Sequence, residues 1–475
     1  MVIREYDLAI VGYGAAGFAS AIKYSELTEG NSKVALIGKG PLGGTCVNVG
    51  CIPSKYLLEA SHKVFYSKFG KYKGIEGSKA KVNFFNLMEG LNEFILNLRK
   101  SKYEDVIESY DNVELIEGEA KFVSDSQLVV NSKNGQIKIS AKNFIVSVGS
   151  RPSIPPIEGI NETGYLTSDT IWNIRDLPSR IGIIGGGAIG VEIGQAFLHL
   201  GADVTIIEAL PRIAYTSEPE ISKLLEEILK EEGIKIFTRV RVAKAYKKNK
   251  EKVLKVLSHD KELELNFDEI IVATGRRPNT DNLNLENVNV RTNSRGQIIT
   301  DDKMQTSNPK IYAAGDCVDK KLMLETLAAK EGTVAAMNIA GQESKMDYLS
   351  IPWAIFTNPS VASVGYLESE AVEKFKVCSC RVIELSDIPK GLIIQERKGL
   401  IKLVIDPNSG KILGVHSLSP YSVEFIIEGA LAVKYGLTIW DIIDSVHIFP
   451  TISEGIKIAS QSFIRNIERM SCCVE

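Results

Sequence analysis

Two glycine-rich loops, each placed between a strand pattern and a helix pattern, constrain the fold of this chain more than any other feature. The first, "GYGAAG" at residues 12–17, follows the apolar run "YDLAIVG", and the second, "GGGAIG" at 185–190, follows "RIGII". Both match G-x-G-x-x-G, in which glycine permits a tight turn, close approach of a pyrophosphate and packing of helix against strand. The N-terminus of the following helix offers free N–H groups to phosphate. Two such units predict two dinucleotide-binding domains, and a flavin and a nicotinamide are the usual pair that exchange a hydride.

The order of the remaining elements predicts an α/β fold in which one nucleotide-binding domain is nested in the other. We expect one nucleotide-binding domain from residues 1–150 and 276–345, and the other from 151–275. From about residue 346 the pattern changes to an α+β domain that extends to residue 475. Residues 83–110 carry a helical pattern between the two glycine loops.

The overall charge argues against nucleic acid as a partner. The 475 residues carry a net charge of -3, with Lys and Arg balanced by Asp and Glu, and no basic stripe is present. The N-terminal apolar run is too short for a signal peptide or a membrane span. We therefore expect a cytoplasmic protein without membrane association, in which reducing conditions keep structural cysteines as thiols.

Four of the seven cysteines form two pairs. Cys46 and Cys51 lie in "GGTCVNVGCIPSK", where nearby glycines, an expected helix start and Lys55 all favour a thiolate. Zinc is disfavoured there because no second cluster of ligands has matching spacing. Cys472 and Cys473 are adjacent near residue 475, and neighbouring Cα atoms are about 3.8 Å apart, too close for an ordinary disulfide. They are either incidental or a dithiol that reaches another group.

The three remaining cysteines, Cys317, Cys378 and Cys380, have no evident partner motif.

An acidic residue about 20 positions after a glycine loop is expected to bind the ribose. In the second unit Glu208 has this position and favours NADH, since a carboxylate repels the 2′-phosphate of NADPH. Arg212 follows closely, so NADPH stays open. In the first unit Gly38 stands where the carboxylate is expected, which leaves that ribose contact unassigned.

Together these motifs resemble the flavoprotein disulfide reductases, the class I pyridine nucleotide-disulfide oxidoreductases that include glutathione reductase. "GGTCVNVGCIPSK" resembles their active-site signature, and "GYGAAG", "GGGAIG", "ATGRRPN", "AAGD" and "FTNPSVASVGY" extend the resemblance over essentially the whole chain. It implies a glutathione reductase-like fold with FAD and NAD(P)H as cofactors, in which residues 1–150 and 276–345 form the FAD-binding domain and 151–275 the NAD(P)H-binding domain. It also implies that 346–475 form the dimerisation domain of a homodimer whose active site is shared between subunits. By position, the expected cofactor-binding residues are Gly12, Gly14, Ala15, Ala16, Gly17, Gly44, Thr45, Lys55, Gly149, Gly185, Gly187, Ile189, Gly190, Glu208, Gly275, Arg276, Gly315 and Asp316.

The same resemblance assigns catalytic roles. Cys51 would be the thiol next to the flavin and Cys46 the outer interchange thiol, while Lys55 and Glu192 would form an ion pair beside flavin N5. A cation at this place stabilises negative charge on the reduced flavin and on a thiolate. Glu454 matches the glutamate of the family's C-terminal "HPTxSE" motif.

One substitution in that C-terminal motif separates branches of the family. The chain reads "FPTISEG", with Phe449 in place of the histidine that shuttles protons in disulfide-reducing members, and His447 two residues upstream. Mercuric reductases are similar in lacking this histidine and in ending with adjacent cysteines. The resemblance therefore implies Hg(II) as substrate, with Cys46, Cys51, Cys472 and Cys473 as its thiolate ligands, because soft ions prefer sulfur.

Three other interpretations stay open at this point. A large thioredoxin reductase also ends in adjacent cysteines but keeps the histidine, whereas dihydrolipoyl dehydrogenase explains neither Phe449 nor the tail. A flavin-bearing redox sensor without turnover is the non-enzymatic alternative.

Overall fold

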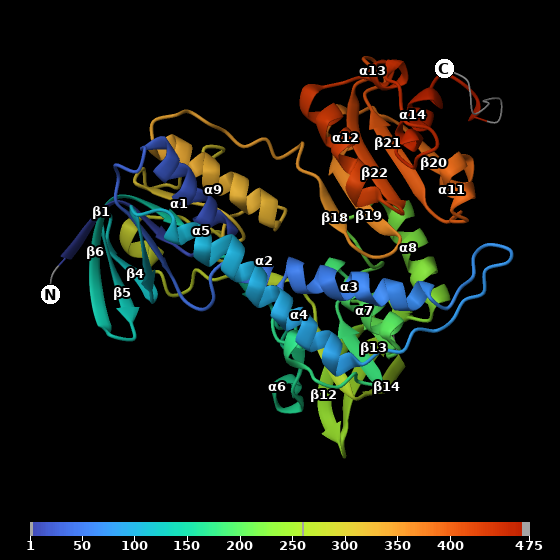
Figure 1. The fold of residues 1–475 in the computed structure, drawn as a ribbon, viewed down its shortest axis with the longest axis horizontal. Coiled ribbons are helices and arrows are strands. Elements are labelled where there is room, and N and C mark those ends of the chain that lie inside the picture. The colour runs from blue at the N-terminus through green and yellow to red at the C-terminus, as the bar shows by residue number, and fades with distance from the viewer. Residues whose placement is uncertain (1–2, 259–260, 468–475) are drawn as a thin grey trace.

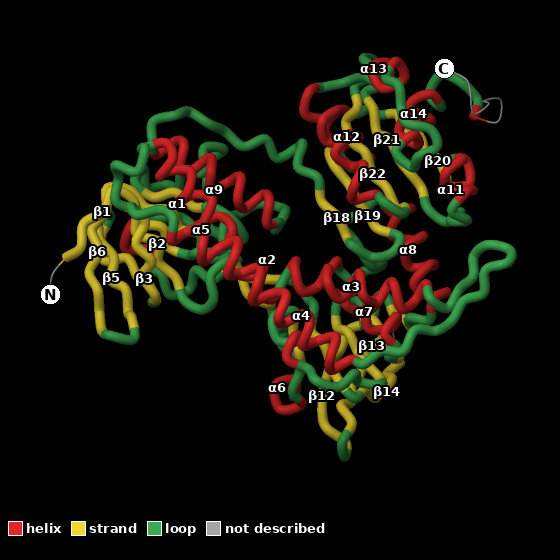
Figure 2. The backbone as a smooth tube through the Cα atoms, in the orientation of Figure 1, coloured by secondary structure: helices red, strands yellow, loops and turns green. Residues whose placement is uncertain are grey.

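The chain forms three units, each built on its own β-sheet (Figure 1). The computed structural model describes residues 3–258 and 261–467. Figure 2 shows sheets of the first two units with helices packed against them, and a third, antiparallel sheet near the C-terminus. The predicted α/β fold class is confirmed.

The first sheet has the order β3-β2-β1-β6 in its parallel part, with β17 pairing to β6 as a further parallel strand. The antiparallel hairpin strands β4 and β5 extend the other half of β6. Strands of this unit are β1 (Ile3–Val11), β2 (Val34–Gly38), β3 (Val113–Glu117), β4 (Glu119–Ser124), β5 (Gln127–Ser132), β6 (Gly135–Val146) and β17 (Ile311–Ala313). Helices α1 (Ala15–Leu27) and α9 (Glu325–Ile339) pack side by side on it, although some 300 residues separate them. The chain therefore leaves this sheet after β6 and returns to it at β17.

The second unit is a five-stranded parallel sheet of order β11-β10-β9-β15-β8. Its elements are β8 (Leu166–Thr167), β9 (Arg180–Ile184), α7 (Ala188–Leu200), β10 (Asp203–Ile207), α8 (Pro219–Glu232), β11 (Lys235–Phe237) and β15 (Glu269–Val272). A three-stranded antiparallel sheet that the sequence analysis did not predict is added by β12 (Arg241–Lys248), β13 (Glu251–Ser258) and β14 (Lys261–Phe267). Two short antiparallel strands, β7 (Ser150–Pro152) and β16 (Arg276–Pro278), carry the chain into and out of this unit.

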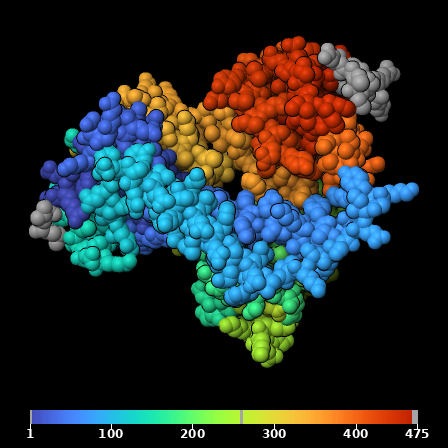
Figure 3. All heavy atoms as spheres, in the orientation of Figure 1, coloured from blue at the N-terminus to red at the C-terminus, as the bar shows by residue number. Residues whose placement is uncertain are grey.

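The third unit is an antiparallel sheet of order β18-β19-β22-β21-β20. Its strands are β18 (Trp353–Ile355), β19 (Ser360–Gly365), β20 (Ser379–Glu384), β21 (Leu400–Ile405) and β22 (Ile412–Ser419). Its helices are α10 (Glu368–Phe375), α11 (Pro389–Ile393), α12 (Ser422–Tyr435), α13 (Ile439–Asp444) and α14 (Glu454–Gln461). In the space-filling view this unit borders the first unit (Figure 3), and its strands β18 and β22 contact helices α7 and α8 of the second.

The helices between β2 and β3 connect the units. They are α2 (Gly44–Val49), α3 (Cys51–Tyr66), α4 (Phe84–Arg99) and α5 (Asp105–Glu108), with a π-helical turn at 100–104 inside the predicted 83–110 helix. The small α6 (Ile160–Thr163) lies apart from them in the second unit. Helix α3 packs against α7, and one apolar cluster joins Leu57 and Leu58 of α3 to the second sheet. Among the described residues, no helix combines the length and apolarity needed to cross a bilayer.

Candidate active site

A cavity of about 1320 Å³ lies where the three units meet. It runs from the first glycine loop past α2 and α3 to the start of β18. Of the predicted site residues, it is lined by Gly12, Gly14, Ala15, Ala16, Gly44, Thr45, Cys46, Cys51, Lys55, Gly149, Ile189, Glu192, Arg276, Gly315 and Asp316. The predicted residues outside its lining are Gly17, Gly185, Gly187, Gly190, Glu208, Gly275 and Glu454.

Two glycines of the first loop, Gly12 and Gly17, leave no room for a side chain. Gly12 has a φ of +113°, and a Cβ there would lie 2.1 Å from the carbonyl oxygen of Ser147, at the end of β6. A Cβ on Gly17 would lie 1.9 Å from the Gly12 oxygen. On Gly44 a Cβ would lie 2.7 Å from the Cα of Gly14, so the loop before the cysteines lies against the glycine loop. Bare backbone at the start of α1, facing a long cavity, fits the pyrophosphate of FAD.

The second glycine loop has the same construction. Gly185 has a φ of +109°, and a Cβ on Gly190 would lie 1.9 Å from the Gly185 oxygen. Glu208, directly after β10, accepts hydrogen bonds from the backbone N–H of Gly186 at 2.6 Å and of Leu210 at 2.7 Å. The loop and this carboxylate fit a nicotinamide dinucleotide bound by its pyrophosphate and ribose.

Arg212 is the residue that kept NADPH as an alternative cofactor in the sequence analysis, and its side chain contacts neighbouring residues of its own loop. Its guanidinium donates to the carbonyl oxygens of Tyr215 at 2.9 Å and Ser217 at 3.2 Å and lies 4.3 Å from the Tyr215 ring centroid.

The two inner cysteines are positioned by two consecutive helices. Cys46 lies in α2, Gly50 separates the helices, and Cys51 is the first residue of α3, as the expected helix start required. Both are half-buried thiols. A hydrogen bond from the Cys46 thiol lowers the pKa of Cys51, and the Lys55 charge lowers it further against the effect of burial. The same hydrogen bond, with burial, raises the pKa of Cys46. The negative charge of the pair is therefore localised on Cys51.

Lys55 lies one helical turn beyond Cys51 and binds Glu192 on α7. Its Nζ is 2.7 Å from Glu192 Oε2 and 4.4 Å from the centroid of the Phe356 ring. Glu192 is buried, and its Oε1 accepts the backbone N–H of Phe356 at 2.8 Å. The predicted ion pair is therefore formed at the cavity wall.

Asp316 and Arg276 meet at Ser150, where the chain enters the second unit. The Ser150 hydroxyl donates to Asp316 Oδ2 at 2.6 Å and accepts from Arg276 Nε at 2.7 Å. Arg276 also forms an ion pair of 3.0 Å with Asp169. Arg276 thus joins β7 and β16 and positions Asp316 through Ser150, while Gly275 beside it has a φ of +98° that permits the turn.

Several cavity residues were not identified from the sequence. Glu325, the first residue of α9, has its pKa raised by burial, and its charge opposes ionisation of both inner cysteines. Phe356 holds Lys55 and Glu192 together, and Glu119 forms an ion pair with Lys39 where the ribose carboxylate was expected. These residues lie outside the quoted signatures or were quoted without a role, and only their proximity in the fold indicates one.

Glu454, His447 and Phe449 lie in the third unit, away from the lining of the large cavity. Burial raises the pKa of Glu454, and its Oε2 is buried without a hydrogen-bond partner. His447 forms an ion pair with Glu428 at 2.9 Å, and its other ring nitrogen lies 3.2 Å from the Ser445 carbonyl oxygen. Phe449 is 52% exposed. Cys472 and Cys473 lie outside the described residues.

An exposed apolar surface covers the same unit. Ile427, Leu431 and Tyr435 follow one face of α12 at intervals of four, and the exposed Trp440, Val446 and Ile448 continue along the chain. A row of exposed apolar residues such as that on α12 is typical of a protein–protein contact.

Comparisons with known proteins identify the family of the chain. The family model described as "Pyridine nucleotide-disulphide oxidoreductase" matches residues 6–332, and the model of its dimerisation domain matches 351–460. A mercuric reductase of Staphylococcus aureus is 37% identical over 470 residues, which are 99% of this chain and 84% of the relative. One of Streptomyces lividans is 35% identical over 472 residues, 98% of each chain.

Solved structures of flavoprotein disulfide reductase type also match almost the whole chain. The HOCl-induced flavoprotein disulfide reductase RclA of Escherichia coli matches with a TM-score of 0.85 at 25% identity, covering 98% of this chain and 100% of that one. LpdA of Mycobacterium tuberculosis matches in fold with a TM-score of 0.87 at 21% identity, covering 98% of this chain and 100% of that one. From the two glycine loops, the Cys46–Cys51 dithiol and these matches it follows that the chain belongs to the pyridine nucleotide-disulphide oxidoreductase family.

Proposed function

We propose that this enzyme reduces Hg(II) to Hg(0) with electrons from NAD(P)H, in the cytoplasm, where reducing conditions keep its dithiols available. The observation that carries the proposal is a dithiol in a cofactor-sized cavity combined with Phe449 in place of an acid–base histidine. Phenylalanine cannot transfer a proton, and His447 is held by Glu428. Reducing a disulfide requires protonation of a sulfur leaving group, whereas releasing a metal from two thiolates does not. Mercuric reductases among the relatives support this choice.

The cysteines hold the substrate ion. Cys51, whose pKa is lowered, offers a thiolate, and Cys46 releases its proton to solvent as it forms the second bond. Hg(II) forms two S–Hg bonds, to Cys46 and Cys51, while its two bonds to the thiolates that delivered it break. The transfer is therefore ligand exchange without change of oxidation state. When bound, FAD and NAD(P)H supply the two electrons that convert Hg(II) to Hg(0). Both S–Hg bonds then break, and the two sulfurs keep their electron pairs.

Lys55 and Glu192 support this chemistry by fixing a positive charge near Cys51. Because Glu192 is buried and held by the Phe356 N–H, it locks the Lys55 ammonium in one place. A fixed cation stabilises the Cys51 thiolate and the negative charge that accumulates in this part of the cavity.

The partner subunit completes the site in this proposal. The exposed apolar surface with Ile427, Leu431 and Tyr435 would pair with a second copy, in agreement with the dimerisation-domain match at 351–460. Cys472 and Cys473 of one subunit would collect Hg(II) and pass it to the inner pair of the other. Glu454 would act at the same shared site.

The test measures NADH oxidation and released Hg(0) vapour together, with Hg(II) in excess thiol, oxidised thioredoxin or lipoamide as alternative substrates. We expect one Hg(0) per NADH and little turnover with either disulfide. The Cys46→Ser variant should lose Hg(0) release but keep bound FAD. Replacing Cys472 and Cys473 by Ala should slow turnover of Hg(II) held by bulky thiols and leave flavin reduction by NADH unchanged. NADH oxidation that follows a disulfide and ignores Hg(II) would refute the proposal.

A further inference from the structure

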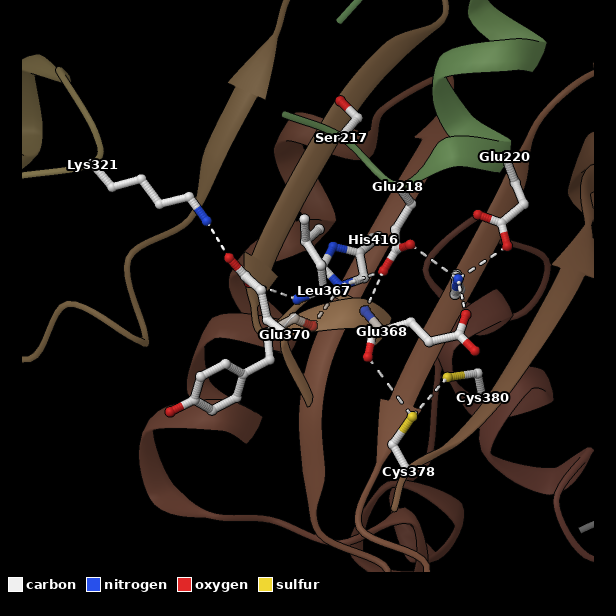
Figure 4. A network of polar contacts seen from close by, with 12 residues as sticks. Ser217, Glu218, Glu220, Lys321, Leu367, Glu368, Glu370, Cys378, Cys380 and His416 are labelled. Atoms are coloured by element: carbon white, nitrogen blue, oxygen red, sulfur yellow. Dashed lines mark hydrogen bonds and ion pairs between the residues drawn. The ribbon is translucent and has the colours of Figure 1, made fainter. Parts of the chain in front are cut away.

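A second pair of cysteines, which the sequence analysis left without a partner, lies at the edge of the third sheet. Cys378 precedes β20 and Cys380 is its second residue. Residues two apart along an extended strand point to the same side. Their Sγ atoms are 3.7 Å apart, and both residues are partly exposed (Figure 4). Neither lines the large cavity, so this dithiol is separate from the Cys46–Cys51 pair.

Glu368 supplies a third donor atom. It is the first residue of α10, and a carboxylate oxygen lies with the Sγ atoms of Cys378 and Cys380 in one group, all within 4.8 Å of one another. In Figure 4 its side chain lies alongside that of Cys380, and the Glu368 carbonyl oxygen faces the Cys378 sulfur. Two sulfurs and one carboxylate oxygen form the kind of donor set that binds a divalent ion of intermediate softness.

An ion pair with Lys402 holds the carboxylate of Glu368 in position. Lys402, only 1% exposed, places its Nζ 2.6 Å from Glu368 Oε2 and 3.1 Å from carboxylate oxygens of both Glu218 and Glu220. Oε1 of Glu368 accepts no hydrogen bond from the described residues and is free to bind an ion. Contacts of this kind orient metal ligands. Lys402 faces three carboxylates, and Arg381 donates to the Cys380 carbonyl oxygen at 2.9 Å. The three negative charges outnumber these two cations before either thiol ionises, which favours binding of a cation.

The sulfur separation of 3.7 Å fits a tetrahedral ion and not a linear one. In a tetrahedral zinc dithiolate with bonds of about 2.3 Å, the two sulfurs lie about 3.8 Å apart. A linear two-coordinate ion would need about 4.6 Å at the same bond length. We propose that Cys378, Cys380 and Glu368 form a Zn(II) site whose fourth position is open to water. Binding releases any thiol protons to solvent and changes no oxidation state.

The experiment isolates this site in the full-length, FAD-loaded protein. Cys46, Cys51, Cys472 and Cys473 are replaced by Ser, which leaves only Cys378, Cys380 and the buried Cys317. The reduced protein is incubated with Zn(II) alone and gel-filtered, its metal content is measured by mass spectrometry, and its affinity by competition with a chromophoric chelator. We expect about one Zn(II) per chain, and an X-ray absorption spectrum with two sulfur ligands.

Variants assign the ligands. Replacing Cys378 and Cys380 by Ser should weaken Zn(II) binding at least 100-fold, and Glu368→Gln about tenfold. Glu370→Gln is the matched control, because Glu370 lies on the same helix but pairs with Lys321, and it should leave Zn(II) affinity unchanged. FAD absorbance checks that each variant folds, and the single Cys378→Ser variant replaces the double one if that fails. The proposal would be overturned if the protein lacking only Cys46, Cys51, Cys472 and Cys473 binds no Zn(II). It would also be overturned if Zn(II) is retained after Cys378 and Cys380 are both replaced, or if the absorption spectrum shows fewer than two sulfur ligands.

Discussion

Lys55 Nζ lies 2.7 Å from Oε2 of Glu192, a pair that joins helix α3 to helix α7. The second oxygen of Glu192 accepts the N–H of Phe356, and the Phe356 ring lies under the Lys55 ammonium. The cation beside the redox cysteines is therefore fixed by residues from three separate parts of the chain. Its position depends on the packing of all three units.

The first prediction concerns this pair. Lys55→Met leaves the carboxylate of Glu192 buried without its cation, and we expect a loss of roughly 2–4 kcal/mol in unfolding free energy. Glu192→Gln should cost less, and the double variant should be more stable than the sum of the two single losses implies. Urea denaturation of the four proteins measures the coupling. The exposed pair Lys223–Glu227 is the control and should show a coupling below about 1 kcal/mol. A similar coupling in both pairs would contradict the burial argument.

The second prediction concerns the choice of nicotinamide. Glu208 is buried beside the second glycine loop, and Arg212 is held by backbone carbonyls and Tyr215. A carboxylate here repels a 2′-phosphate, so kcat/KM should favour NADH over NADPH by about tenfold or more, about 1.4 kcal/mol. The Glu208→Gln variant keeps the shape of the side chain but removes its charge, and it should reduce the ratio of kcat/KM with NADH to kcat/KM with NADPH. Steady-state kinetics with both nucleotides measures it, and a wild-type preference for NADPH would show that Glu208 does not decide specificity.

The third prediction explains the missing ribose carboxylate. Gly38 ends β2 where an acidic residue is expected, but a Cβ there would lie 2.5 Å from ring carbons of Tyr13, whose hydroxyl donates to the Gly40 oxygen. Gly38→Ala should therefore destabilise the protein by about 1–3 kcal/mol and lower its FAD content. Adding Tyr13→Ala should relieve part of this effect, whereas Tyr13→Phe, which keeps the ring, should not. Thermal denaturation and the ratio of flavin to protein absorbance are the measurements. If Gly38→Ala lowers stability equally in proteins with Tyr13, Tyr13→Ala and Tyr13→Phe, the steric explanation is excluded.

Sequence reasoning finds most directly the residues whose function depends on local backbone conformation. Gly12 and Gly185 need positive φ, and Cys51 needs the first position of a helix, so short patterns reveal them. Phe356 and Glu325 reach the cavity only because distant elements pack together, and no local pattern records that contact. Cys378 and Cys380 show no partner motif in the sequence, because Glu368, which lies with them in the fold, comes from a separate helix.

The fourth prediction concerns the buried cation of the third unit. Lys402 is 1% exposed, and the opposing charges of Glu368 and Glu218 outweigh burial to raise its pKa. Lys402→Met in zinc-free protein should lower the unfolding free energy by roughly 3–5 kcal/mol, because Glu218 is left buried and unpaired. Lys398→Met removes an exposed lysine that pairs with Glu231 and should change stability by less than about 1 kcal/mol. Equal effects of the two substitutions in urea denaturation would contradict this account.

The fifth prediction is a pH dependence that arises at Glu331, on α9. Burial raises the pKa of Glu331 to about 7, although the Gly315 N–H and the Tyr348 hydroxyl donate hydrogen bonds to its carboxylate. The folded protein holds this proton to higher pH than the unfolded chain does. The contribution of Glu331 to stability is therefore fully present below the unfolded pKa, about 4.5, and is lost as pH rises through about 7, by roughly 3 kcal/mol in total.

Glu331→Gln cannot titrate, so its stability relative to wild type should rise between pH 5 and pH 8 in urea denaturation. Glu343→Gln is the control, because Lys303 lowers the pKa of that exposed carboxyl and no such rise is expected. A stability difference between wild type and the Glu331→Gln variant that stays constant from pH 5 to pH 8 would show that Glu331 is already ionised in the folded protein.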